Sequence, residues 1–250
     1  MLEQFKGAAD IGFRELQQMC KSIPQLSSLK LDEEVDYCGS EFQSDAISEG
    51  LLPADTKETG YRALKTIADG NCLFRSASIF AFGNQHRHEE MRVRTVLELA
   101  LNSEFYQKGN DVDKISLAQM SEIYPKGGER PSKLSDECVR TEFESEVRSS
   151  TACNSWCGYW HLQALGTVLG RQIRSVYPGS GSNEVRKYFN AIICPRQYDP
   201  LKEPLTFMWT HTTGGDASKL RPNHFVPLIP DSKKLAGTLF IQATLSCQVE

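Results

Sequence analysis

A cysteine that follows a tight turn and opens an apolar segment constrains this chain more than any other feature of its sequence. The turn is Asp69-Gly70-Asn71, and Cys72 begins an apolar, alanine-containing run that ends near Gly83. Glycine and asparagine tolerate the backbone angles of a strand-to-helix junction, so the pattern predicts Cys72 in the first turn of a helix. There, unpaired N–H groups and the positive end of the helix dipole favour a thiolate and can receive an oxyanion. The alternative is a buried structural cysteine, because free cysteine is among the most buried residue types.

Length, charge and cysteine usage narrow the class of protein. The 250 residues suffice for a sizeable core, and the net charge of -4 argues against a nucleic-acid binder with a basic surface. No window is apolar over the length that spans a bilayer, and the first residues lack a secretory apolar segment. The eight cysteines are scattered along the chain. We therefore expect reduced thiols, a cytoplasmic or nuclear setting, and neither a membrane nor nucleic acid as a partner.

The order of the predicted elements, helices first and then several closely spaced strands, is typical of an α+β architecture. We divide the chain into an N-terminal helix with an acidic lead-in (residues 1–58) and a main domain (residues 59–250). The lead-in is expected to be solvated, or alternatively to contact a basic partner. Periodicity and breaker residues predict helices over residues 5–19, 72–82, 89–101, 135–147 and 155–170, and strands over residues 62–67, 173–177, 187–193, 205–210, 225–229 and 238–243. In the helix predicted over residues 89–101, Arg92, Arg94 and Glu98 are expected to face water.

A thiol nucleophile needs a base, and five histidines are available. His86, His88 and His211 lie in polar loops or turns, where surface positions are usual. His224 differs, because it introduces a strongly apolar strand and would present its imidazole at a rigid sheet edge. It also follows Cys72 in the order and at the rough separation seen in papain-like cysteine proteases. His224 is thus the predicted base, with a structural histidine as the alternative.

A second cluster has the residue types of a metal site. Cys153, Cys157 and His161 are spaced by four residues, so one helical face would carry all three, and Cys138 would be the fourth zinc ligand. Structural zinc sites, however, usually take pairs of ligands from separate turns rather than three from one straight helix. Two small thiols packed in a core beside neighbouring tryptophans explain the pattern equally well. We expect core packing here and no bound metal.

Three blocks of the sequence point jointly to a known family. The first is Asp69-Gly70-Asn71-Cys72-Leu73-Phe74-Arg75, the second runs from Trp156-Cys157-Gly158 through residue 170 to Tyr177-Pro178, and the third is Asn223-His224-Phe225. In this order, the blocks resemble those of the ovarian-tumour (OTU) cysteine deubiquitinases. Residues 92–99, 159–161, 188–190 and 222–228 further resemble the OTU-like domain of vertnin and its transposon-associated relatives. The resemblance spans residues 60–229, and the first block is its most specific part.

The resemblance implies a papain-like, OTU-type α+β fold with helices packed on a small mixed sheet. It implies a thiol-dependent deubiquitinase (ubiquitinyl hydrolase) that cleaves after the C-terminal Gly-Gly of ubiquitin or of polyubiquitin, as a monomer without a cofactor. Cys72 would be the nucleophile, His224 the general base, and Asp69 would shape the loop whose backbone forms the oxyanion hole. Asn71 and Phe225 would contact the substrate. Phe225 would wall a narrow groove, or else serve in ordinary strand packing.

One position departs from the family pattern. Many OTU enzymes carry Asp or Asn two residues after the histidine, and here that position is Val226, which cannot accept a hydrogen bond from the imidazole. The orienting group would instead be Asn223, an acidic residue upstream of Cys72, or Gln242, unless the site works as a dyad. This departure leaves two other functions open: a ubiquitin-binding scaffold without turnover, and a protease for a ubiquitin-like modifier or a mobile-element polypeptide.

Overall fold

The protein is built around a mixed five-stranded sheet. The structure, a computed structural model, describes residue 5 and residues 7–24, 26–58, 60–108, 115–116, 118, 134–178, 183–213 and 221–231. The strands are β1 (Tyr61–Ala63), β2 (Ile173–Val176), β3 (Ala191–Ile193), β4 (Leu205–Thr210) and β5 (His224–Pro230). Their order across the sheet is β1-β5-β4-β2-β3, with β2 and β4 parallel and the other neighbouring pairs antiparallel.

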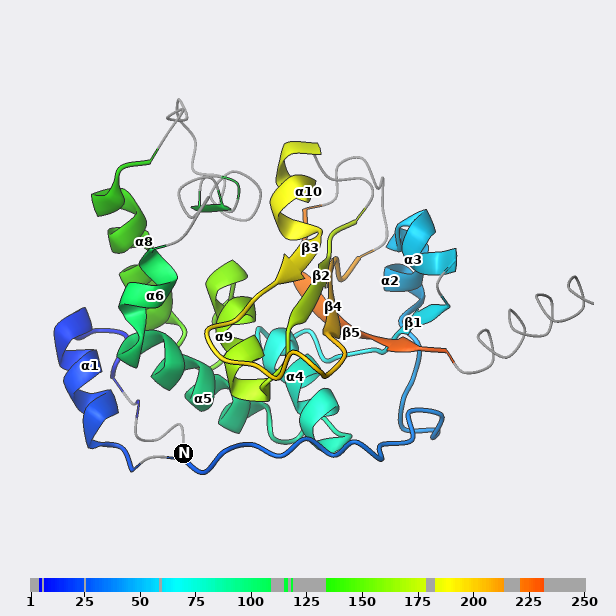
Figure 1. Ribbon diagram of the computed structural model, residues 1–250, viewed down its shortest axis with the longest axis horizontal. Helices are drawn as coiled ribbons and strands as arrows, with labels where there is room; N and C mark the ends of the chain where they lie inside the picture. The colour runs from blue at the N-terminus through cyan, green and yellow to red at the C-terminus, as the bar shows by residue number, and fades with distance from the viewer. Residues whose placement is uncertain are drawn as a thin grey trace, which may run out of the picture.

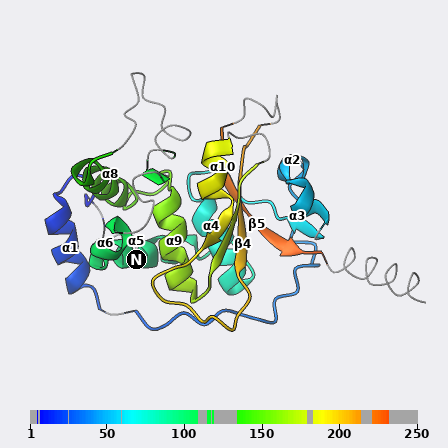
Figure 2. The same ribbon diagram turned by 45° about the horizontal axis from the view of Figure 1, so that its top comes forward.

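Helices cover both faces of this sheet. They are α1 (Phe13–Ser22), α2 (Ala46–Leu51), α3 (Ala54–Glu58), α4 (Cys72–Phe82), α5 (His88–Leu101), α6 (Ser103–Gln107), α8 (Asp136–Ser149), α9 (Tyr159–Leu169) and α10 (Asn183–Phe189). Figure 1 and Figure 2 show α4 and α9 on one side of the sheet and α2 and α3 on the other. The predicted α+β fold, with helices packed on a small mixed sheet, is confirmed. Within the described part of the chain, no helix has both the length and the apolar character needed to cross a bilayer.

The alternation of side chains in the central strands separates two cores. In β4, Phe207 and Trp209 face the core shared with α4 and α9, whereas Met208 faces a smaller cluster next to α2. In β5, Phe225 lies in the core shared with α4 and α9, and Val226 lies in the cluster next to α2. Because successive side chains of a strand point to opposite faces, a strand covered on both sides reads as a continuous apolar run. This explains why both strands were readable from the sequence.

The segment before residue 59 packs closely onto the rest of the chain. Phe13, Leu16 and Cys20 of α1 lie in a core with residues of α5, α8 and α9. Further along, the N–H of Asp45 donates to the carbonyl of Ala63 (2.9 Å), next to the sheet edge. In the acidic lead-in itself, the carboxylates of Asp32, Glu34 and Glu41 are exposed, as expected for a solvated segment. The boundary between residues 58 and 59 stays a prediction.

Helix ends with a clear local signal lie where the sequence places them. Residue Gly83 ends α4 in the left-handed conformation (φ 65°), which glycine adopts at little cost. Several other predictions need correction. The helix expected over residues 5–19 runs from Phe13 to Ser22, and the strand expected over residues 62–67 ends at Ala63. The helix expected over residues 155–170 begins only at Tyr159, and the strand expected over residues 187–193 is shortened to β3 because its first half belongs to α10. In α10, Phe189 is buried against Trp209 at 4.9 Å between ring centroids, a contact that only the folded chain creates. The strand predicted over residues 238–243 lies outside the described residues.

Candidate active site

Cys72 is the first residue of α4, as the turn before it predicts. The turn requires a glycine: Gly70 has φ +78°, and a Cβ there would lie 2.0 Å from the carbonyl oxygen of Asn154. The loop before the helix is thus pressed against the segment that follows α8. This close approach of two loops fixes where the helix, and with it the thiol, begins.

The carboxylate of Asp69 holds the turn together. It accepts hydrogen bonds from the backbone N–H of Asn71 (3.0 Å) and from the guanidinium of Arg75 (2.6 Å). Burial alone would raise the pKa of Asp69, but these hydrogen bonds and the charge of Arg75 outweigh it and hold the pKa well below its usual range. Both oxygens therefore serve the shape of the loop, which agrees with the role implied by the resemblance.

Arg92 joins this loop to the segment after α8, a role that the sequence did not indicate. Its side chain, expected in water, is fully buried. The guanidinium donates to the carbonyl of Gly70 (2.9 Å), to Oδ1 of Asn71 (2.8 Å), to the carbonyl of Ser150 (3.0 Å) and to that of Ser155 (3.1 Å). A buried guanidinium is tolerated because most of its donors find acceptors. Helical periodicity could not reveal it, since the acceptors come from distant loops.

Asn71 uses its side chain inside the same network. Oδ1 accepts from Arg92, while Nδ2 donates to Asp69 (3.1 Å) and to Oδ1 of Asn154 (2.7 Å). The residue is only 4% exposed. Because its side chain is buried and hydrogen-bonded within the loop, Asn71 can contact a substrate only through its backbone.

The thiol of Cys72 reaches the strand that carries His224. Burial raises the pKa of Cys72 to about 11, against the lowering effect of backbone hydrogen bonds from Phe225, Leu73 and Cys72 itself. The helix N-terminus thus acts in the predicted direction, but burial is the larger effect and the resting group is a thiol. The hydrogen bond from Phe225, the residue after His224, brings the two predicted catalytic residues to one junction between α4 and β5.

His224 opens β5, and the residue is only 3% exposed. Nε2 lies 3.0 Å from Oγ1 of Thr66, and this hydroxyl also lies 2.7 Å from the carbonyl oxygen of Phe225. Among the described residues, Nδ1 is buried and has no hydrogen-bond partner. Burial lowers the pKa of His224, while the charge of Asp45 and a backbone hydrogen bond with Thr66 raise it. The imidazole is therefore neutral near pH 7.

Among the described residues that the sequence proposed as orienting groups, none hydrogen-bonds His224. The side chain of Asn223 accepts from the N–H of Thr212 (3.0 Å) and donates to its hydroxyl (3.2 Å), away from the imidazole. Val226 packs in the core beside α2, and Gln242 lies outside the described residues. Among the acidic residues upstream of Cys72, Asp45 has the largest effect on the pKa of His224, and it acts only through its charge. The side chain that does hydrogen-bond the imidazole is Thr66, through its hydroxyl. The sequence marks Thr66 only by its position just before the turn.

Phe225 does not line a groove. Its side chain is fully buried, with ring centroids 4.4 Å from Trp209 and 5.5 Å from Trp156, the latter in a stacked arrangement. The structure therefore favours strand packing, the alternative that the sequence left open, over a substrate-facing aromatic wall. Trp156 instead belongs to the segment that covers the junction.

A cleft opens beside the histidine. It measures about 580 Å³ and its walls include Thr66, His224 and the exposed Ile67, together with the carboxylates of Glu41 and Asp45. His211, assigned to a polar turn, lines the same cleft. The cleft thus combines apolar and acidic surface next to the predicted base.

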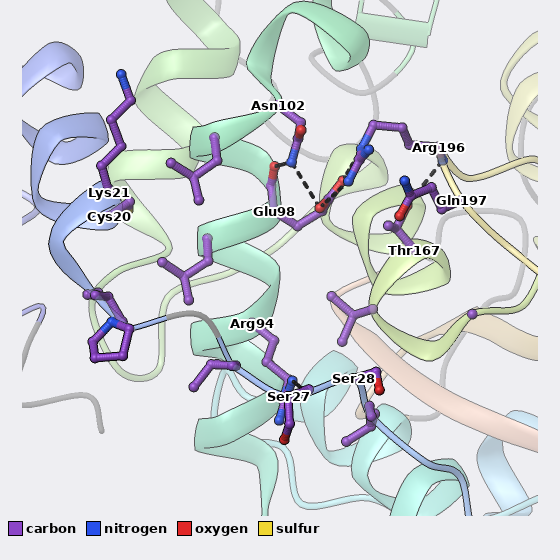
Figure 3. A pocket seen from close by; sticks show the side chains of 18 residues that line it. Cys20, Lys21, Ser27, Ser28, Arg94, Glu98, Asn102, Thr167, Arg196 and Gln197 are labelled. Atoms are coloured by element: carbon purple, nitrogen blue, oxygen red, sulfur yellow. Dashed lines mark hydrogen bonds and ion pairs between the residues drawn. The ribbon is translucent and has the colours of Figure 1, made fainter.

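A second, larger cavity lies away from this junction. Its volume is about 690 Å³, and it lies between the end of α1, one side of α5 and the end of α9 (Figure 3). In Figure 3, Arg196 reaches across to Glu98, with which it makes a 2.7 Å ion pair. None of the predicted catalytic residues lines this cavity. The larger of the two cavities is therefore not the one that His224 lines.

The alternative metal site does not assemble. Helix α9 begins at Tyr159, so Cys153 and Cys157 precede it and do not share a helical face with His161. Cys157 is buried, and burial raises its pKa to about 12, whereas Cys153 is exposed. Within the described ranges, no group of three or more His, Cys, Asp or Glu residues is arranged to hold a metal ion.

Comparisons with known proteins agree with the motifs. The family model described as "Vertnin, OTU domain" matches residues 63–210. Vertnin of Danio rerio is 32% identical over 200 residues, covering 78% of this chain and 29% of its own length. Vertnin of Homo sapiens is 31% identical over 169 residues, covering 67% and 24%. The chain therefore spans only about a quarter of the length of these curated relatives.

Two solved OTU structures are more distant. The OTU domain of OTUD1 is 19% identical, with a TM-score of 0.40 over 73% of this chain and 99% of its own. The OTU domain protease of Farallon virus is 12% identical, with a TM-score of 0.39 over 75% and 88%. The family match covers more than half of the chain and includes the loop before α4. This chain belongs to the family of vertnin OTU domains.

Proposed function

We propose that the chain is a thiol-dependent deubiquitinase that hydrolyses the peptide or isopeptide bond after the C-terminal glycine of ubiquitin. The observation that carries the proposal is the junction of α4 and β5. There the thiol of Cys72 is hydrogen-bonded to the backbone of the residue after His224. Nδ1 of that histidine is buried and unpartnered among the described residues. Membership of an OTU family supports ubiquitin as the substrate.

The proposed chemistry is acyl transfer through a thioester. Nδ1 of His224 takes the thiol proton as the sulfur of Cys72 bonds to the carbonyl carbon of the last glycine. The carbonyl electron pair moves to oxygen, which the backbone N–H of Cys72 stabilises at the start of α4. When the tetrahedral intermediate collapses, the C–N bond breaks and the imidazolium protonates the leaving amine. Water, deprotonated by the same ring, then hydrolyses the thioester and releases the thiol.

The resting site in this mechanism is a neutral pair. The raised pKa of Cys72 and the lowered pKa of His224 both favour thiol and imidazole over thiolate and imidazolium. Proton transfer therefore accompanies the attack on the substrate rather than preceding it. Every charge that forms in this step is new, so the electrostatic work falls on the loop and on the helix N-terminus.

Hydrolysis of ubiquitin carrying a C-terminal fluorogenic amide tests the proposal. We expect turnover by the wild type, none by Cys72→Ala, and a loss of about 1,000-fold or more for His224→Gln. Cys138→Ala, which removes an exposed thiol on α8, is the matched control and is expected to keep full activity. Activity that survives Cys72→Ala, or a wild type that is folded and inert, would contradict the proposal.

A ubiquitin-binding module without turnover is the second candidate. Two observations favour it: Cys72 and His224 are each only 3% exposed, and no carboxylate or amide of the described residues hydrogen-bonds the imidazole. Saturable binding of ubiquitin by a wild type that does not hydrolyse the fluorogenic substrate would select this function over the first.

The setting of the protein is also proposed. Seven described cysteines are free, which suits a reducing cytoplasmic or nuclear compartment. We propose that the chain acts there as a monomer, without a cofactor and without nucleic acid. Sedimentation of the purified chain at the mass of one copy supports this, and a stable dimer contradicts it.

A further inference from the structure

We propose that Thr66 is the positioning residue of the site: its hydroxyl holds His224 in the tautomer protonated at Nε2, which leaves Nδ1 as the base. The inference rests on the proposed function and names a residue that the family pattern does not supply at this place. It replaces the missing Asp or Asn with a neutral group that comes from before the nucleophile rather than from β5.

The number of protons on the Thr66 hydroxyl decides which group donates in its contact with His224. A threonine hydroxyl has one proton to donate and lone pairs that accept. The carbonyl oxygen of Phe225, 2.7 Å from Oγ1 of Thr66, can only accept, so the hydroxyl proton points to that carbonyl. At the 3.0 Å contact with Nε2 of His224, Oγ1 must therefore be the acceptor. Nε2 consequently carries the ring proton.

The second step follows from the neutral ring. A neutral imidazole has one N–H, and with that proton at Nε2 the lone pair is at Nδ1. Nδ1 is buried and has no hydrogen-bond partner in the described part of the chain. A buried, unpartnered acceptor is costly, so it persists where function needs it. The proposed mechanism pairs Nδ1 with the thiol proton of Cys72, whose sulfur is hydrogen-bonded to the backbone of the neighbouring Phe225.

Thr66 is held rigidly enough to do this. It is only 4% exposed, and its hydroxyl bridges the imidazole to the same strand that carries the imidazole. Its position in the chain, just before the turn at Asp69, also ties the orientation of the base to the oxyanion loop. The charged or titratable groups that act on the ring are Asp45, Asp69 and His211, none of which hydrogen-bonds it.

A neutral orienting group has a kinetic consequence. A carboxylate would stabilise the imidazolium that forms during attack, whereas a hydroxyl stabilises it only through its dipole. Removing the hydroxyl should therefore lower kcat by about 10- to 1,000-fold, less than the roughly 10⁴-fold loss seen when an orienting carboxylate is replaced. The effect should fall on kcat and not on KM, because Thr66 touches the base and not the substrate.

The test combines kinetics with the ¹⁵N spectrum of the imidazole. In the full chain with ¹⁵N-labelled histidine, the His224 signals are assigned by their loss in His224→Gln. We expect the Nε2–H tautomer in the wild type and in Thr66→Ser, and a mixture of tautomers with a lowered kcat in Thr66→Val. Thr95→Val is the matched control, since it also removes a buried hydroxyl, one bonded to the carbonyl of Met91, and should change neither readout.

The two proposals fail separately. A wild-type ring protonated at Nδ1, or a Thr66→Val variant that keeps both the Nε2–H tautomer and the wild-type kcat, overturns the role of Thr66 even if the chain is an active deubiquitinase. An inactive wild type with the Nε2–H tautomer, lost in Thr66→Val and restored in Thr66→Ser, supports the role of Thr66 and overturns only the enzymatic function.

Discussion

Arg92 is the residue that links the two loops next to Cys72. It donates hydrogen bonds both to the loop before α4, at the carbonyl of Gly70, and to the segment after α8, at the carbonyls of Ser150 and Ser155. Its burial costs desolvation, and the multiple hydrogen bonds offset that cost. A single side chain thus sets the distance between two loops that meet above the nucleophile.

Arg92→Met should lower the free energy of unfolding by about 3–5 kcal/mol, because several buried acceptors lose their donor. Arg140→Met is the control, since Arg140 is half exposed and pairs with Glu137 on the surface of α8, where such pairs contribute about 1 kcal/mol or less. Chemical denaturation of both variants checks this. Equal stability of the two variants would mean that the buried network is energetically neutral.

The protonation state of Cys72 gives a second prediction at this scale. Because burial raises its pKa to about 11, the thiolate fraction should increase with pH from neutrality to beyond pH 10. The rate of alkylation of Cys72 by iodoacetamide, followed by mass spectrometry, should rise over the same range. The chain unfolded in guanidinium is the control, where the rate should level off near the ordinary thiol pKa of about 8.5. A plateau below pH 7 in the folded protein would instead indicate a preformed thiolate–imidazolium pair.

At the scale of elements, the site is the meeting of one helix start with one strand start. The close approach of Gly70 to Asn154 fixes the start of α4, and the pairing of His224 with Thr210 fixes the start of β5. The thiol of Cys72 is hydrogen-bonded to the backbone of Phe225, the second residue of β5.

Gly70→Ala should disrupt this junction more than a comparable change elsewhere. Both Gly70 and Gly170 have positive φ, but only at Gly70 would the new Cβ collide with backbone, that of Asn154. Gly170→Ala should cost about 1–2 kcal/mol of stability from the conformation alone and leave activity intact. Gly70→Ala should cost more and lower kcat/KM by about 100-fold, because the loop is displaced. Similar kinetics for the two variants would refute the role given to this contact.

Local signals predicted the elements well and the contacts between them poorly. A few neighbouring residues suffice to predict each of these features: the turn before Cys72, the glycine after α4 and the apolar run of β5. The partner of His224 is not, because Thr66 lies 158 residues away along the chain. The burial of Arg92 is hidden for the same reason. The sequence thus indicates a candidate nucleophile and a candidate base, but the groups that contact them appear only when distant loops are brought together.

At the scale of the whole molecule, the N-terminal segment is part of the fold that supports the site. Helix α1 fills a core against α5 and α8, and α5 carries Arg92 (Figure 1). Glu33 forms ion pairs with Arg171 and Lys202, between the segment that follows α1 and the residues beyond α9. The stability of the junction is therefore linked to residues far from it.

Removal of residues 1–58 should destabilise the remaining chain severely. The truncation exposes the core that Phe13, Leu16 and Cys20 cover, and each large apolar side chain contributes about 1.5–3 kcal/mol when buried. That loss is a large part of the roughly 5–15 kcal/mol that holds a domain folded. Thermal unfolding followed by circular dichroism checks it, with Glu104→Gln in the full chain as a surface control that should melt almost as the wild type does, because the pair of Glu104 with Lys108 is exposed. A cooperative transition of residues 59–250 close to that of the full chain would show that the boundary predicted from sequence is a true domain boundary.

The most direct test of the central claim is covalent capture by ubiquitin with an electrophile in place of its C-terminal carboxylate. We expect the wild type to gain the mass of one ubiquitin, with the adduct located on Cys72 by peptide mapping, and Cys72→Ala to remain unmodified. An unlabelled wild type, or an adduct on any other cysteine, would contradict the assignment of Cys72 as a nucleophile toward ubiquitin.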